Sequence, residues 1–125
     1  MEPMPRRIPA PPPWRFLTAP PGVRLTLAAD PAADAELLTV IAPPAQEARR
    51  EPALTGLVVT VLRHPACPPA VAARNVGHPD VGVRRLVLDV DGLPATALDS
   101  LAYDPDSHVS ERARALLSAR ERDLR

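Results

Sequence analysis

The sequence predicts an all-α fold, a short α-solenoid of about three degenerate two-helix repeats that follows an extended, proline-rich arm. Apolar residues and prolines return in register after 26 positions, and the residues between the prolines carry apolar stripes with the period of a helix. Aromatic residues make up only 2% of a chain that is 46% hydrophobic, so the core must consist of Leu, Val, Ile and Ala, which suits closely packed helices. A chain of 125 residues has room for one such core.

The arm is expected over residues 1–22, and the helical repeat domain over residues 23–125. Positions 11–13 are all proline, and proline lacks the amide hydrogen that helices and sheets require. The arm also carries Trp14 and Phe16, two of the three aromatic residues. We expect these side chains to anchor the arm, either in a groove of a partner or on the first helix of the chain's own domain.

The next segment begins with an ambiguous pattern. Residues 23–27 alternate apolar and polar side chains, which is typical of a half-buried strand, but five residues do not separate a strand from the start of a helix. Helical signals begin at Asp30, which can cap a helix, and Pro31, which suits the first helical position. Pro43 and Pro44 should end that helix.

The repeat is clearest in residues 68–93 and 94–119. An offset of 26 superposes the prolines and the apolar positions of these two segments, pairing Pro68 with Pro94, Ala72 with Leu98, Pro79 with Pro105, Val83 with Val109 and Val87 with Ala113. The same offset of 26 also aligns Leu57 with Val83 and Val61 with Val87, which indicates a third, more degenerate copy of the repeat. Fixed periods of this length mean stacked units that cannot bury their apolar faces alone.

Each unit is expected to contain two helices. The first helix is short because helix-breaking residues flank it, Pro68 and Gly77 in one copy. We therefore expect it to be partly 3₁₀. The second carries one apolar stripe, formed in the same copy by Val83, Leu86, Val87 and Val90. His78-Pro79-Asp80 and Asp104-Pro105-Asp106 precede the two copies of the second helix, where we expect proline to occupy the first helical position and the acids to favour the helix dipole.

These residues resemble a known family. Residues 94–109 read Pro-x-x-x-Leu-x-x-Leu-Ala-x-Asp-Pro-Asp-x-x-Val, and with their echo in residues 68–83 they are similar to the variant leucine-rich repeat, a HEAT-like α-solenoid repeat of bacterial proteins. The resemblance covers about residues 43–119. It implies alternating α and short 3₁₀ helices in a right-handed superhelix, with a role in macromolecular interaction. The sequence departs from the pattern where Asn75 stands for Leu101 and His78 for Asp104.

No residue pattern predicts an enzyme. His64 and Cys67 have the spacing of a nucleophile or metal pair, but an imidazole that ends a helix and a small apolar thiol explain them better. Asp104, Asp106 and His108 cluster in the opening turn of one helix, where the dipole alone favours acids. The iron-sulfur cluster known beside such repeats has no counterpart, since Cys67 is the single cysteine, and we expect no cofactor and no metal.

A protein partner is the expected ligand. All fifteen basic residues are arginine, and fifteen acids balance them to a formal net charge of zero. The chain therefore has no net positive charge that would attract a nucleic-acid phosphate backbone. No apolar stretch reaches the ~18 residues that span a bilayer and no signal-like run is present, so we expect a soluble protein without a membrane partner. The single cysteine favours a reducing cytoplasm. Nucleic-acid binding, a subunit of an enzyme complex and homo-oligomerisation remain alternatives. The expected surface comprises Arg63, Arg84, Arg85, Asp89, Ser110 and Arg114, with Trp14 and Phe16 on the arm.

Overall fold

The computed structural model describes residues 12–124, and within this range every regular element is a helix. The prediction of an all-α fold is therefore confirmed. The elements are η1 (Pro13–Phe16), α1 (Pro21–Ala29), α2 (Ala35–Ile41), α3 (Ala45–Arg50), η2 (Pro52–Leu54), α4 (Thr55–Arg63), α5 (Pro69–Ala73), α6 (Val81–Val87), α7 (Ala95–Ala102) and α8 (Ser107–Asp123). None of these helices has the length and apolar content needed to cross a membrane.

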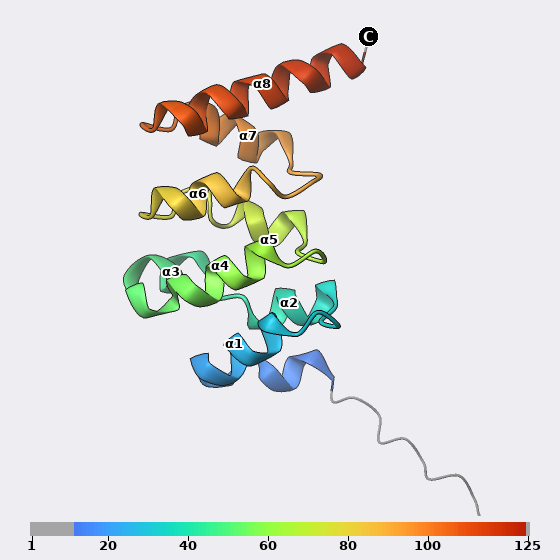
Figure 1. The fold of residues 1–125 in the computed structure, drawn as a ribbon, viewed down its shortest axis with the longest axis vertical. Coiled ribbons are helices and arrows are strands. Elements are labelled where there is room, and N and C mark those ends of the chain that lie inside the picture. Colours follow the sequence, from blue (N-terminus) through green and yellow to red (C-terminus); the bar gives the residue numbers. More distant parts are fainter. Residues whose placement is uncertain (1–11, 125) are drawn as a thin grey trace, which may run out of the picture.

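The helices follow one another along the long axis of the molecule in chain order (Figure 1). Helix α4 packs against α1 on one side and against α6 on the other, and α7 packs against α8. Figure 1 shows α1, α4, α6 and α8 as successive levels of the molecule, with α2, α5 and α7 beside them. Neighbours in sequence are thus neighbours in space, which short connections between helices favour.

The period found in the sequence recurs in the helix boundaries. Helices α4, α6 and α8 begin at Thr55, Val81 and Ser107, which are equally spaced along the chain at the repeat interval. Pro68 and Pro94, separated by the same interval, are the residues before α5 and α7. Proline at a helix start loses no hydrogen bond, because the first amides of a helix have no acceptor within the helix. The prolines therefore set where each first helix begins.

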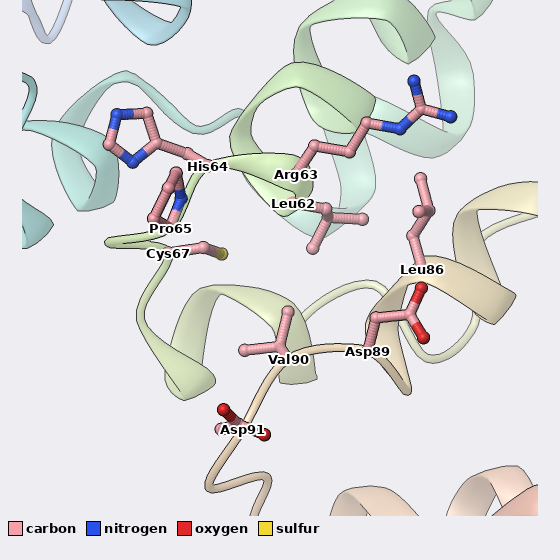
Figure 2. Close-up of a pocket in the computed structure, with 9 residues that line it drawn as sticks. All are labelled: Leu62, Arg63, His64, Pro65, Cys67, Leu86, Asp89, Val90 and Asp91. Atoms are coloured by element: carbon pink, nitrogen blue, oxygen red, sulfur yellow. The ribbon is translucent and has the colours of Figure 1, made fainter. Parts of the chain in front are cut away.

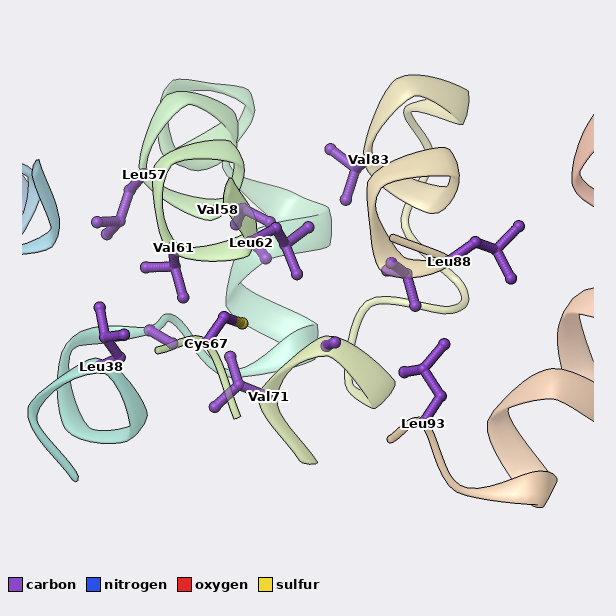
Figure 3. Close-up of a cluster of buried hydrophobic side chains, with 14 of the residues drawn as sticks. Leu38, Leu57, Val58, Val61, Leu62, Cys67, Val71, Val83, Leu88 and Leu93 are labelled. Atoms are coloured by element: carbon purple, nitrogen blue, oxygen red, sulfur yellow. The ribbon is translucent and has the colours of Figure 1, made fainter. Parts of the chain in front are cut away.

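Burial repeats with the same period. Two positions of the second helices are almost fully inaccessible in all three copies, and they are occupied by Leu57, Val83 and Val109 and by Val61, Val87 and Ala113. Within each helix the two positions are one helical turn apart, so both side chains lie on one face. Figure 3 shows Val61 of α4 directed toward Cys67 and toward Val71 of α5, and Val83 of α6 directed toward α4. Burying each large aliphatic side chain stabilises the fold by roughly 1.5–3 kcal/mol.

The amino-terminal expectations need correction. Residues 23–27 belong to α1, so the strand reading of their alternating pattern is wrong. The helix begins at Pro21, inside the segment assigned to the arm, because Pro20 is extended and Pro21 presets the first helical φ. Residues 13–16 form the turn η1 for the same reason. The remainder of the predicted arm, residues 1–11, lies outside the described residues.

The helix starts also differ from the expectation in detail. Pro79 precedes the N-cap Asp80, whose carboxylate accepts a hydrogen bond from the amide of Gly82 at 2.7 Å. Asp106 caps α8 in the same way, accepting from Val109 at 3.0 Å. An aspartate side chain reaches the free amides of the first turn, so the helix starts after the acid and not at the proline. Helix α2 likewise starts after Asp34, not after Asp30.

Candidate binding surface

Arg84 is an internal clamp and not part of an open surface. Its Nε donates to Asp104 Oδ2 at 2.7 Å and its Nη2 to Asp104 Oδ1 at 3.3 Å. Its Nη1 donates to the backbone carbonyls of His78 at 2.7 Å and Pro79 at 3.1 Å. The side chains of Arg84 and Asp104 are only 14% and 4% exposed. A guanidinium with four internal acceptors has few donors left for a partner, so Arg84 is a weaker candidate contact than the sequence indicates.

The position of Arg84 explains this burial. Val58 stands one repeat before it and Ser110 one repeat after it, and both are buried. At this position Arg84 contacts the turn between α7 and α8, whereas Ser110 is buried on α8, the last described helix. Two of the residues that we assigned to a polar outer face therefore lie inside the molecule. The bidentate pair that results is of the stronger class of hydrogen bonds, in which both partners are charged.

Two other predicted residues pair across the same boundary but stay accessible. Arg85 Nη2 lies 3.3 Å from Asp106 Oδ2, and its side chain is 51% exposed. Asp89 Oδ1 lies 2.6 Å from Arg112 Nη2, with both side chains about half exposed. Such surface pairs contribute little stability and exchange partners readily. Arg85 and Asp89 can therefore face a ligand.

The remaining predicted residues are spread over the molecule. Arg63 is exposed at the end of α4, and Arg114 is exposed on α8. Trp14 is 65% exposed on η1, whereas Phe16 is half-buried and packs against the core. The aromatic pair is thus divided, with Phe16 anchoring η1 on its own domain and Trp14 facing outward. Of the predicted set, the structure brings Arg63 and Asp89 together.

These two residues lie on a cleft of about 670 Å³ between the carboxyl ends of α4 and α6. Arg63 and Asp89 stand 26 positions apart, Arg63 as the last residue of α4 and Asp89 in the turn that follows α6. The cleft is also lined by Leu62, Cys67, Leu86, Val90 and Asp91, and by His64 and Pro65 of the loop after α4 (Figure 2). It therefore combines apolar side chains with one positive and two negative charges.

His64 and Cys67 do not form a reactive pair. The Nε2 atom of His64 lies 2.9 Å from the carbonyl oxygen of Asp30, and its Nδ1 accepts from the amide of Ala66 at 3.0 Å. The imidazole is therefore held on both nitrogens by the backbone and leaves none for a nucleophile. Burial raises the pKa of the Cys67 thiol to about 11, so the thiol stays protonated near neutral pH.

The acids before α8 also have structural partners. Asp104 holds Arg84 and accepts from the amide of Asp106 at 2.9 Å, and Asp106 caps the helix. The hydrogen bond from Val109 is the main reason that the pKa of Asp106 is lowered. Across residues 12–124, no three His, Cys, Asp or Glu side chains gather in a way that suits a metal ion.

Besides Ser110, sequence reasoning missed the burial of His78 and Arg24. His78 is 3% exposed at the turn before α6, and Arg24 is 8% exposed where α1 faces α3, with its Nη2 atom 3.6 Å from Glu47 Oε1. A signal was available for His78, because it stands at the repeat position of Asp104. None was available for Arg24, which lies outside the repeated segments.

Comparison with protein-family models, curated proteins and solved structures finds no match to this chain, so its function is inferred from the residues and contacts described above.

Proposed function

We propose that the chain is a non-enzymatic interaction module, a short α-solenoid that binds a segment of a protein partner in the cleft between α4 and α6. The equal spacing of the starts of α4, α6 and α8 supports the solenoid reading. So does the return of the buried positions after each repeat period, since stacked units share a continuous core. The packing of α4 against both α1 and α6 agrees with it.

The single observation that carries the proposal is the composition of the cleft. Leu86 and Val90, which are only partly buried, offer apolar contacts, and charged side chains lie around them. Sites of this kind accept an apolar anchor and fix its orientation through a few polar groups. Arg63 lies at the end of α4 and Asp89 in the turn after α6, so a bound segment would meet one charge of each sign.

The same charges favour a protein over a nucleic acid. Asp89 and Asp91 both line the cleft, and carboxylates repel the phosphates of a nucleic-acid backbone. The backbone contacts of His64 and the raised pKa of Cys67 support binding without covalent chemistry.

A library of displayed peptides tests the proposal. We expect the chain to select peptides, and the double substitution Arg63→Glu with Asp91→Arg to weaken the best of them at least ~10-fold, about 1.4 kcal/mol. Both residues are exposed, so the variant should keep its fold. The matched control is Arg114→Glu, an exposed arginine outside the cleft, which should leave the affinity unchanged.

Three results would overturn the proposal. The first is a library that yields no binder tighter than ~100 μM, and the second is a peptide whose affinity the double substitution leaves unaltered. The third is displacement of the peptide by a single-stranded oligonucleotide with a steep loss of affinity on adding salt, which would favour nucleic-acid binding instead.

A further inference from the structure

The turn before α6 contains His78, and the equivalent position in the turn before α8, 26 residues later, is Asp104. Nδ1 of His78 accepts a hydrogen bond from the amide of Asp80 at 3.0 Å. One segment later, Oδ1 of Asp104 accepts from the amide of Asp106 at 2.9 Å. In both turns, therefore, the side chain accepts a hydrogen bond from the backbone amide two residues further along the chain. A carboxylate keeps its acceptor oxygens throughout the neutral range, whereas an imidazole nitrogen accepts only while it carries no proton.

The bond to Asp80 fixes the protonation state of His78. Because Nδ1 accepts, the neutral ring must carry its proton on Nε2. That Nε2 atom is buried and has no hydrogen-bond partner among residues 12–124, and the whole residue is only 3% exposed. A second proton would have to go onto Nδ1, where it would face the Asp80 amide hydrogen instead of accepting it.

The charges around the ring are mixed. The backbone of Gly77 lies against the guanidinium of Arg49 from α3, and a Cβ atom at position 77 would collide with it. Burial lowers the pKa of His78 most, the carboxylate of Asp80 raises it, and Arg84 and Arg49 lower it further. The net direction is downward from the ordinary value of 6.5. The added proton is therefore disfavoured in the folded chain.

His78 also contacts Arg84, which links α6 to Asp104 in the turn between α7 and α8. Its backbone carbonyl accepts from Nη1 of Arg84 at 2.7 Å, and the other nitrogens of that guanidinium hold Asp104. Breaking the turn at Asp80 would move this carbonyl. A change at His78 is thereby transmitted to the contact between α6 and the α7–α8 pair.

We propose that His78 makes the link between α6 and the α7–α8 pair sensitive to mildly acidic pH, because protonation breaks its turn bond and loosens the Arg84 clamp. The sign follows from the two states of the chain. The unfolded chain binds the proton first, so stability is complete above the unfolded value of about 6.5 and falls as the pH drops toward the lower folded value.

Thermal unfolding at pH 7.5 and pH 5.5 tests this inference, since ordinary carboxylates stay ionised across that window. The wild-type midpoint should fall by about 4 °C or more at pH 5.5. In His78→Asn the amide oxygen accepts as Asp104 does, so its midpoint should fall by at least about 3 °C less than the wild-type midpoint; any remaining fall belongs to His64, whose Nδ1 also accepts a backbone amide. His108→Asn, which removes an exposed histidine from α8, should behave like the wild type. An unchanged wild-type midpoint, or an equal loss in His78→Asn, overturns the proposal.

A second measurement covers the case in which His78→Asn does not fold. The ring signals of His78 in the wild-type chain, followed by NMR, should titrate with a midpoint below 6.5. Amide hydrogen exchange at the start of α6 should rise at pH 5.5 above the rise of the intrinsic rate. A titration midpoint at or above 6.5, or protection unaltered through the titration, refutes the inference.

Discussion

Removal of Arg84 should expose how much the internal clamp contributes to stability. The substitution Arg84→Ala deletes four hydrogen bonds and leaves the carboxylate of Asp104, whose side chain is 4% exposed, without its cation. Breaking a buried ion pair costs ~3–5 kcal/mol. Because Asp104 keeps the hydrogen bond from the amide of Asp106, we expect a smaller loss, about 2–4 kcal/mol.

Urea unfolding measures this loss. With an m value of about 1–2 kcal/mol per molar, the midpoint should fall by at least about 1 M. Arg85→Ala is the matched control, because Arg85 is the next residue, pairs across the same boundary with Asp106 and is 51% exposed. An exposed pair contributes only about 0–1 kcal/mol.

A double-mutant cycle with Asp104→Asn isolates the pair itself, and we expect a coupling energy above about 1 kcal/mol. The reasoning fails if Arg84→Ala and Arg85→Ala destabilise the chain equally, or if the coupling energy is near zero.

Two further predictions concern the exposure of single side chains. Phe16→Ala should lower the free energy of unfolding by about 1–3 kcal/mol, since the ring packs against the core, whereas Trp14→Ala should change it by less than about 0.5 kcal/mol. Chemical denaturation compares the pair, and equal losses would show that η1 is not docked as described. With its pKa raised to about 11, Cys67 should react with iodoacetamide at pH 8 at least ~100-fold more slowly in the native chain than in urea. Mass spectrometry follows this reaction, and rapid labelling of the native chain would contradict the burial of the thiol.

The helical core was accessible from the sequence because its signal is periodic. Val83 and Val87 repeat in Val109 and Ala113, and helix packing needs little more than such a stripe. Helix α1 was not accessible, because Val23 to Leu27 alternate like a strand and only the packing of α1 on α4 decides between the two forms.

The candidate surface was harder to predict than the core. An arginine in a helix is expected to face outward, yet Arg84 turns inward because it contacts Asp104 in the turn between α7 and α8. That register depends on how the segments stack. The repeat aligns Arg84 with Val58, an apolar residue, which was a hint that the position is buried. The structure buries Val58 and Ser110 and leaves the Arg84 side chain only 14% exposed.

The position shared by Val58, Arg84 and Ser110 has a consequence for how such a chain can change in length. The position is apolar in α4, cationic in α6 and small and polar in α8. A tandem copy of residues 94–119 would set the second Asp104 opposite Ser110, which cannot neutralise it. Lengthening the chain at this end would therefore require a cation in place of Ser110.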